Sequence, residues 1–589
     1  MCNCSDQPTQ CHHEPLLPKA TACPELGNHR PRRGGGGDGG ESVVAEAASI
    51  VRLAVPMVGA GLLMYMRSLV SMLFLGRLGR LPLAGGSLAL GFANITGYSV
   101  LSGLATGMDP VCGQAFGAGR TWVLAAALRR TVALLLVASV PIALLWLAMR
   151  RVLVAAGQDP EIAAAAYEFI LCSLPDLAVQ SCLHPLRVFL RAQSVTLPLT
   201  YAAAAALLLH VPVNFLLVGR LRLGIRGVAL AAVCTNLNLL LFLVAYVYIS
   251  GLLHGNNGNV DGDGDGKAAA GAGACATTTP ADEEGASVVE WRKLARLSVQ
   301  SCMSVCLEWW WYEIMVLLCG VLADPKAAVA AMGILIQTTS LLYIFPHSLS
   351  CAVSTRVGHE LGAGRPDRAR RAARVGLAAG AALGLVACAF AASVRGVWAR
   401  MFTADAAVLR LAAAALPILG AAELGNCPQT AGCGVLRGSA RPGTAARVNV
   451  AAFYGVGMPA ALALAFWPGR LDFPGMWVGM LAAQFVCAAL MLQAVRRTDW
   501  AEQAVRAREL TGGAVAEDDD DDVKSAAHAD ADKVKADSGM LVATVLSAGE
   551  MDLHVKKSLL SERNGERVQS RRFVMRRLER AKQAFVRFY

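Results

Sequence analysis

The chain has 589 residues, of which 55% are hydrophobic and 16% are charged, and its mean hydropathy is +0.47. This composition excludes an ordinary soluble protein, in which about a quarter of the residues are charged. The formal net charge of +11 does not indicate nucleic-acid binding, because most Lys and Arg residues flank apolar stretches. We therefore expect an all-α, multi-pass membrane protein.

The chain begins with a polar, Gly-rich segment that contains several cysteines and histidines. Their spacing does not match a zinc site, so we predict no metal site there. No signal peptide is recognisable, and the first apolar span is expected to direct membrane insertion. The other cysteines lie mostly within apolar stretches, where they are interpreted as packing thiols rather than as a disulfide framework.

Apolar windows of about 20 residues, the length of a bilayer-spanning helix, predict twelve spans. A low-complexity stretch separates the sixth span from the seventh, and the composition becomes polar again after residue 500. The predicted spans lie near 51–75, 84–107, 122–148, 162–184, 196–219, 227–252, 293–319, 327–350, 372–394, 406–434, 444–467 and 474–495.

Two short motifs occur twice, at nearly the same offset. GQAFGAGR (113–120) recurs as GHELGAGR (358–365), and LRAQS (190–194) recurs as LRGSA (436–440). Because six spans separate the copies, the halves keep the same orientation and are parallel repeats of six helices each. The predicted domains are a disordered cytoplasmic tail (1–44), an N-terminal bundle (45–252), a cytoplasmic linker (253–290), a C-terminal bundle (291–500) and a cytoplasmic tail (501–589).

The loops after the even-numbered spans carry more Arg and Lys than the loops after the odd-numbered spans. Positive charge accumulates on the cytoplasmic side, so both termini and the linker are predicted to be cytoplasmic. The glycines of the repeated GAG motifs are expected to permit tight turns and close approach of helices. Asp109 and Glu360, next to these motifs, are expected to pair with arginine or to cap helices.

The seventh predicted span contains SCMSVCLEWWWYEIMVLLC (301–319), with two carboxylates at Glu308 and Glu313. Ionisable side chains in a span are costly and usually face the protein interior or a water-filled cavity. Glu308 and Tyr312 are four residues apart and share one helix face, whereas Glu313 points elsewhere. The tryptophans Trp309–Trp311 could grip an organic ligand, or they could form an interfacial belt or pack in the core.

Four motifs together resemble the multidrug and toxic compound extrusion (MATE) family, most closely its plant detoxification-protein branch. They are MDPVCGQAFGAGR (108–120), CLEWWWYE (306–313), STRVGHELGAGRPDRAR (354–370) and QTAGCGVLRGSARP (429–442). The resemblance covers roughly residues 45–500. It implies twelve helices in two bundles and cation-coupled antiport of organic solutes, with protons as the usual coupling ion in plant members.

The resemblance also implies that acidic residues in the first and fourth helices of the C-terminal bundle bind the coupling proton. Glu308 matches the first acid, but the position of the second is an amide, Asn426. Glu423 lies one turn earlier on the same face, so we predict Glu308 and Glu423 as the proton-coupling residues. The first helix of the N-terminal bundle (56–76) lacks the aspartate of bacterial members, and Arg67 is its only formal charge. This argues against a second ion site in that bundle.

Six further residues are predicted to bind substrate or line the cavity, since they are polar or aromatic and fall within the spans of the C-terminal bundle. A helix–helix hydrogen bond is the alternative for the glutamines, and a structural hydrogen bond for Glu313. The six are Trp309, Tyr312, Glu313, Gln337, Asn426 and Gln429.

The end of the chain (571–589) shows a separate pattern. Apolar residues recur at spacings of three and four, and basic residues fill much of the rest. This is typical of a basic amphipathic helix, which binds an anionic leaflet or a calmodulin-type cytoplasmic partner.

The function predicted from these features is proton-coupled export of organic solutes such as xenobiotics, secondary metabolites or hormone-like compounds. The alternatives are a flippase for lipids or amphiphiles with a related fold, and a signalling membrane protein with vestigial transport. We do not expect an enzyme, because no Ser/His/Asp set, metal cluster or nucleotide loop is present. The expected partners are small organic substrates and membrane lipids, without nucleic acid, and no cofactor is expected besides the coupling proton. The sequence leaves the plasma membrane and endomembranes (vacuole, Golgi, endosome) as alternative locations.

Overall fold

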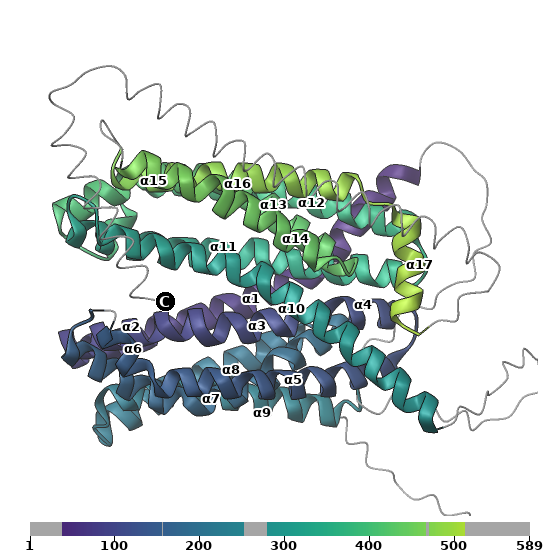
Figure 1. Ribbon diagram of the computed structural model, residues 1–589, viewed down its shortest axis with the longest axis horizontal. Helices are drawn as coiled ribbons and strands as arrows, with labels where there is room; N and C mark the ends of the chain where they lie inside the picture. Colours follow the sequence, from purple (N-terminus) through teal and green to yellow (C-terminus); the bar gives the residue numbers. More distant parts are fainter. Residues whose placement is uncertain (1–37, 156, 253–279, 467–470, 513–589) are drawn as a thin grey trace, which may run out of the picture.

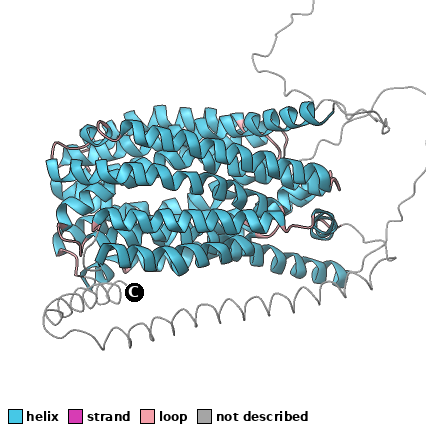
Figure 2. Cartoon of the chain, turned by 90° about the horizontal axis from the view of Figure 1, so that it is seen from above, coloured by secondary structure: helices cyan, strands magenta, loops and turns pink. Residues whose placement is uncertain are grey.

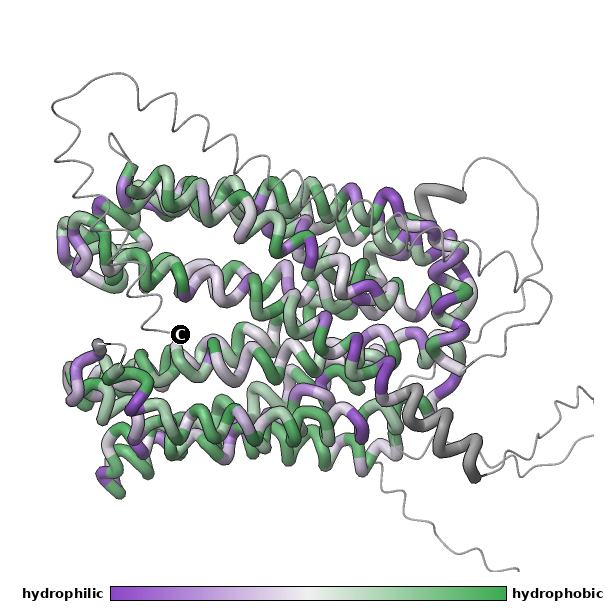
Figure 3. Tube along the Cα trace, viewed as in Figure 1, coloured by the Kyte–Doolittle hydropathy of each residue, from purple (hydrophilic) through white to green (hydrophobic). Residues whose placement is uncertain are grey.

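The computed structural model describes residues 38–155, 157–252, 280–466 and 471–512, and in these ranges all regular secondary structure is helical (Figure 2). Twelve helices are long and apolar enough to cross a membrane. Apolar residues dominate along both bundles, and polar residues gather towards their ends (Figure 3). The chain is therefore an all-α, multi-pass membrane protein, as the sequence predicted. The N-terminal tail before residue 38, most of the linker and the amphipathic segment 571–589 lie outside the described residues.

The first six spans form the N half, drawn in purple to blue in Figure 1. The second span is a composite, because a π-helical segment, η1, interrupts it between α2 and α3. The elements of this half are α1 (Asp38–Leu78), α2 (Arg80–Ala93), η1 (Asn94–Tyr98), α3 (Ser99–Thr106), α4 (Asp109–Gly117), α5 (Thr121–Leu147), α6 (Met149–Ala155), α7 (Pro160–Ala192), α8 (Leu197–Asn214), η2 (Phe215–Arg220) and α9 (Gly224–Ile249).

The last six spans form the C half, drawn in teal to green in Figure 1. A short helix, α17, follows the last span and was not identified from the sequence. The elements are α10 (Pro280–Cys319), α11 (Pro325–Gly362), α12 (Pro366–Val394), η3 (Trp398–Met401), α13 (Ala406–Gly438), α14 (Pro442–Asn449), η4 (Val450–Gly457), α15 (Met458–Phe466), α16 (Phe473–Arg496) and α17 (Trp500–Leu510).

Local sequence sets where the long helices begin and end. Asp159, Asp324 and Asp405 precede α7, α11 and α13, and each carboxylate accepts hydrogen bonds from the first backbone N–H groups of its helix. At the opposite end, α4 and α11 finish in the same GAGR sequence. Gly119 and Gly364 have φ values of 74° and 67°, which glycine adopts without steric cost. The turns 117–120 and 362–365 define what we call the GAGR end of the molecule.

The two halves contact each other at the GAGR end through a crossing of α4 and α11. Gly113 faces Gly358 so closely that a Cβ built on Gly358 would lie 3.3 Å from the Cα of Gly113. A Cβ on Gly117 would overlap the carbonyl oxygen of His359, and one on Gly362 would overlap that of Gln114. The repeated glycines therefore allow two backbones to touch, as the sequence predicted.

Hydrogen bonds at this crossing follow the same repeat. Gln114 Nε2 donates to the carbonyl oxygen of Gly438 at 2.9 Å, and His359 Nε2 donates to that of Ala192 at 2.7 Å. Gln114 and His359 are equivalent positions in the two GAG motifs, and Ala192 and Gly438 are equivalent in the LRAQS and LRGSA motifs. The interface thus has an approximate two-fold axis, as expected for parallel repeats.

Ion pairs reinforce the GAGR end. Asp109 pairs with Arg191 from its own half and with Arg437 from the C half, the latter at 3.5 Å. Glu360 pairs with Arg356 and Arg365, each at 2.8 Å. These contacts confirm the expectation that Asp109 and Glu360 pair with arginine. Away from this end the helices of the two halves diverge (Figure 1).

Candidate functional site

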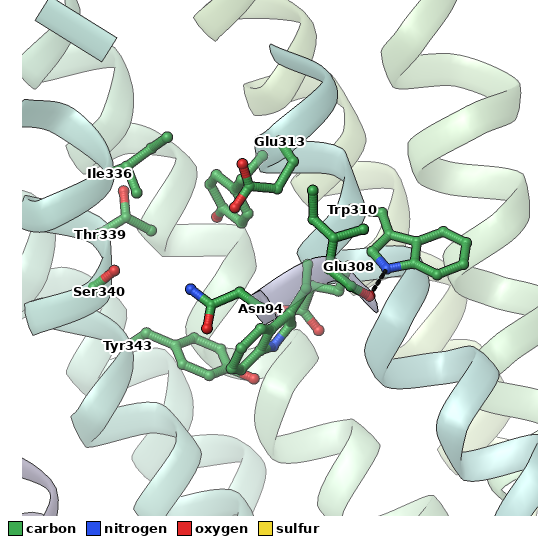
Figure 4. A pocket seen from close by; sticks show the side chains of 11 residues that line it. Asn94, Glu308, Trp310, Glu313, Ile336, Thr339, Ser340 and Tyr343 are labelled. Carbon is green, nitrogen blue, oxygen red and sulfur yellow. Dashed lines mark hydrogen bonds between the residues drawn. The ribbon is translucent and has the colours of Figure 1, made fainter. Parts of the chain in front are cut away.

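A pocket of about 260 Å³ lies between the two halves. The N half contributes Asn94 and Ile95 from η1, and the C half contributes residues of α10 and α11. Figure 4 shows α11 on one side of the pocket and Trp310 of α10 on the other, with the amide of Asn94 between them. The residues of the C half that line it are Glu308, Trp309, Trp310, Tyr312, Glu313, Ile336, Thr339, Ser340 and Tyr343.

Glu308 is the most deeply placed acid of this pocket, with 8% of its surface exposed. Its carboxylate makes no hydrogen bond to any other described residue, although it interacts electrostatically with His347, Glu423 and Arg437. Burial penalises the charged form of a carboxyl group, and a carboxylate that lacks donors is not held in that form. The geometry therefore suits a side chain that gains and loses a proton.

The second predicted acid, Glu423, lies on α13 in a line of polar residues that faces the interior. Asn426 Nδ2 donates to Glu423 Oε2 at 2.9 Å, and Thr430 Oγ1 donates to Asn426 Oδ1 at 3.4 Å. We define the C-half stripe as Glu423, Asn426, Thr430, Cys433 and Arg437. Through Arg437 and its ion pair with Asp109, this stripe runs to the GAGR end.

The predicted cavity residues fall into two groups. Trp309, Tyr312 and Glu313 line the pocket, whereas Gln337, Asn426 and Gln429 are not among its lining residues. Gln429 is fully buried, donates to Cys433 Sγ of its own helix at 3.4 Å and interacts with Cys487 of α16. It is therefore a packing residue rather than part of the pocket wall.

The three adjacent tryptophans occupy three environments. Trp311 is fully buried and packs on Phe453, with ring centroids 5.7 Å apart. Trp310 Nε1 donates to the carbonyl oxygen of Ile95 at 3.2 Å and so joins the halves. Trp309 lines the pocket and is 37% exposed. The three tryptophans therefore do not share one role: neither ligand binding nor an interfacial belt or core packing describes all of them.

Sequence reasoning missed the contribution of η1. Its π-helical geometry places Asn94 in the pocket and presents the Ile95 carbonyl to Trp310. Such segments are frequent at functional sites. The available signal was a lone amide in an apolar span, which the apolar-window analysis does not weigh.

A buried polar network in the N half was missed as well. Asp176 of α7 accepts hydrogen bonds from Asn236 Nδ2 at 2.8 and 3.0 Å, and Asn236 Oδ1 accepts one from Arg67 Nη1 at 2.7 Å. Residues 56–76 of the first span contain no carboxylate, but the fourth span supplies one at Asp176. The polar residues that dilute the predicted span 162–184 were the signal.

The polar residues of α7 form one line, the N-half stripe, which we define as Asp176, Gln180, His184, Arg187 and Arg191. Spacings of three and four place these side chains on a single helix face. Among the described residues, no group of three or more His, Cys, Asp or Glu side chains is placed to hold a metal ion.

Comparison with known sequences gives consistent matches along both halves. The family model described as MatE matches residues 56–216 and 301–462. Protein DETOXIFICATION 49 of Arabidopsis thaliana is 54% identical over 481 residues, which cover 82% of this chain and 91% of the relative. Protein DETOXIFICATION 52 of the same plant is 53% identical, over 79% of this chain and 87% of the relative.

Solved structures share the fold. The crystal structure of the eukaryotic MATE transporter AtDTX14 superposes with a TM-score of 0.72 at 30% identity, over 80% of this chain and 100% of that chain. An outward-facing multidrug resistance MATE transporter gives a TM-score of 0.64 at 16% identity, over 81% of this chain and 99% of that chain. The second likeness concerns the fold alone.

Proposed function

Since the chain belongs to the MATE family of transporters, we propose that it exports organic solutes in exchange for protons by alternating access. Members of the family are membrane transporters, and the chain is accordingly not an enzyme. Glu308 would carry the coupling proton and Glu423 would act as the second acid. The GAGR end and both termini would face the cytoplasm, in line with the charge bias of the loops.

The observation that carries the proposal is the position of Glu308. Its carboxylate lines a pocket between the halves, accepts no hydrogen bond from the described residues, and interacts electrostatically with Arg437. Arg437 also pairs with Asp109 of the opposite half. Glu308, Arg437 and Asp109 thus form a series of three interacting charges. Protonation of Glu308 removes one of them, so it changes the relative free energies of the conformations in which the GAGR end is closed and open.

Glu423 fits the role of the acid that the resemblance places at Asn426. The amide of Asn426 donates to the Glu423 carboxylate, so the carboxylate lies directly beside the position that the amide occupies. Both side chains are buried, with 3% and 2% of their surfaces exposed. Glu423 also interacts electrostatically with Glu308, and two nearby acids of like charge favour a shared proton.

The test is transport in proteoliposomes with an imposed pH gradient, using a panel of organic cations, phenolics and organic acids. We expect gradient-driven flux of at least one class in the wild type. Glu308→Gln keeps the size of the side chain and mimics its neutral form, so it should fold and lose the gradient-driven flux.

The matched control is Glu168→Gln, which alters an exposed glutamate paired with Arg226 and should transport normally. Gradient-driven flux in Glu308→Gln equal to that of the wild type would refute the assignment of Glu308. Wild-type flux that ignores the pH gradient would refute proton coupling itself.

A further inference from the structure

Helix α17 lies at the GAGR end, outside the twelve spans. It has 11 residues and is about 16 Å long at 1.5 Å per residue, so it is too short to cross a membrane. Figure 1 shows it running crosswise to the long helices, from the C half towards α4 of the N half. The carboxylate of Asp499 caps it by accepting hydrogen bonds from the N–H groups of Ala501 and Glu502. The helix is therefore an addition to the two bundles rather than part of a span.

The inner face of α17 is anchored on the C half. Ala504 and Ala507 are 7% and 1% exposed, and both belong to a hydrophobic cluster formed mainly by helices of the C half. Trp500 packs against the same cluster. Just before the helix, Thr498 Oγ1 accepts a hydrogen bond from Arg441 Nη1 at 2.9 Å. These contacts tie α17 to the C half along most of its length.

The end of α17 reaches the N half. Leu510 packs against the hydrophobic cluster that contains Met108 and Val111, and α17 contacts α4 directly. The carbonyl oxygen of Thr511 accepts a hydrogen bond from Arg120 Nη1 at 2.6 Å. Thr511 is 3% exposed, so water competes little for this bond.

The same end of α17 lies against both GAGR turns. A Cβ built on Gly364, in the turn 362–365, would lie 3.2 Å from Arg508 Nη2. A Cβ built on Gly512 would lie 3.9 Å from Nη1 of Arg120, the last residue of the turn 117–120. These two turns end the helices α4 and α11, whose crossing joins the halves. α17 therefore bridges the halves at the place where they separate when the GAGR end opens.

We propose that α17 is a clasp that holds the GAGR end closed and releases the N half before that end opens. Its contact with the C half is a buried apolar face, whereas its contact with the N half centres on the Arg120–Thr511 hydrogen bond and on Leu510, which is only partly buried. The weaker contact breaks first, so α17 stays with the C half during the cycle. One net hydrogen bond changes an equilibrium by about fivefold, which slows opening without preventing it.

This inference rests on the proposed alternating access and adds a regulatory element to it, whatever the solute and the coupling ion are. The ratio of open to closed GAGR end in the purified, full-length protein tests it without requiring transport. Spin labels are attached through a non-natural amino acid at Arg129 of α5 and Arg374 of α12, which are exposed and lie at equivalent positions of the repeat. Pulsed electron paramagnetic resonance then gives the distribution of distances between the labels.

We expect the open-to-closed ratio to rise about fivefold in Arg120→Ala, which removes the hydrogen bond to Thr511. Leu510→Ala should raise it at least about threefold, because it removes apolar contact with the N half. Arg120→Lys keeps a charged donor without the planar fork, so it should retain part of the closure.

Val505→Ala is the matched control, because it shortens an apolar side chain on the exposed face of the same helix and should leave the ratio unchanged. An unaltered ratio in both Arg120→Ala and Leu510→Ala, including a single closed population throughout, would overturn the inference. An equal rise in Val505→Ala would also overturn it, since the stability of α17 rather than its contact with the N half would then be responsible. Absence of proton-driven flux in a protein whose ratio responds as expected would instead count against the proposed function alone.

Discussion

The fourth span of each half, α7 in one and α13 in the other, shows how a duplicated fold has acquired two different interiors. At the offset that relates LRAQS to LRGSA, four of the five positions in each stripe correspond, and the arginines at the GAGR end are shared, whereas Asp176 and Glu423 are one position out of register. The inner positions differ in charge. The corresponding pairs are Gln180 and Asn426, His184 and Thr430, Arg187 and Cys433, and Arg191 and Arg437.

This difference suggests a division of work between the halves. The C half places Glu308 and Glu423 in its interior, whereas the N half places Arg67 and Arg187 there with one occupied carboxylate. The positive charges of the arginines disfavour the binding of a proton or another cation nearby. Binding of the coupling proton is therefore expected in the C half.

The largest effect on transport is expected from removing the second acid of the C half. Glu423→Gln should abolish pH-driven flux if Glu423 has taken over the role expected at Asn426. Adding Asn426→Asp to this variant should recover part of the flux, because positions three apart share a helix face. Uptake into proteoliposomes measures both effects.

Asn426→Asp alone serves as the control for the rescue and should remain active. Normal flux in Glu423→Gln would leave Glu308 as the sole coupling acid. If the double variant folds, as Glu423→Gln does, but recovers no pH-driven flux, the second proton site lies away from Asn426.

A smaller effect is expected when the C half receives, at Cys433, the arginine that the N half carries at Arg187. Cys433 interacts electrostatically with Glu308, so an arginine in Cys433→Arg should reach the Glu308 carboxylate and stabilise its charged form. We expect pH-driven flux to fall by at least about tenfold. Cys433→Met, which adds length without charge, controls for crowding, and an equal loss in that variant would contradict the electrostatic account.

The sequence predicted the twelve spans and the repeat because both follow from patterns along the chain: apolar length and recurrent motifs. It also predicted that Glu308 would face a cavity, because a lone carboxylate within a membrane span has few other favourable environments. It did not predict that Asp176, Asn236 and Arg67 meet, because residues so far apart in sequence are brought together only by the packing of α1, α7 and α9. The π segment at Asn94 and helix α17 were missed because neither leaves a strong apolar signal.

The effect of membrane potential on transport distinguishes an anionic from a cationic substrate. One-for-one exchange of a carboxylate leaving and a proton entering moves two charges, whereas exchange of a monovalent organic cation for a proton moves none. Each charge is worth about 2.3 kcal/mol per 100 mV. We therefore expect a potential that is negative on the cytoplasmic side to accelerate the exchange of a transported monovalent acid several-fold and to leave the exchange of a transported monovalent cation unchanged. Voltage-dependent exchange of the cation, or voltage-independent exchange of the acid, would contradict one-for-one exchange with a proton.

The smallest expected effect concerns a contact at the GAGR end that the repeat does not duplicate. Arg120 Nη1 of the N half donates to the carbonyl oxygen of Thr511, just after α17, at 2.6 Å, whereas the equivalent Arg365 pairs with Glu360. Arg120→Ala should loosen α17 and speed its amide hydrogen exchange by about fivefold, the value of one net hydrogen bond. Transport should change by less than this factor, because the glycine crossing of α4 and α11 remains intact. Arg410→Ala, which removes an exposed arginine bonded within its own helix, should leave exchange in α17 unaltered.

The coupling proton is expected to bind to the acids of the C half and not to the N half. The most direct test is the ratio of open to closed GAGR end in the purified protein as a function of pH, measured with spin labels at Arg129 and Arg374. Proton binding and this conformational equilibrium are linked, so the wild-type ratio should change between mildly alkaline and mildly acidic pH. The double variant Glu308→Gln, Glu423→Gln carries neutral side chains at both positions and should have, at every pH, the ratio that the wild type reaches at mildly acidic pH. A wild-type ratio that does not change with pH, or a pH dependence that survives in the double variant, would contradict the assignment of the proton to the C half.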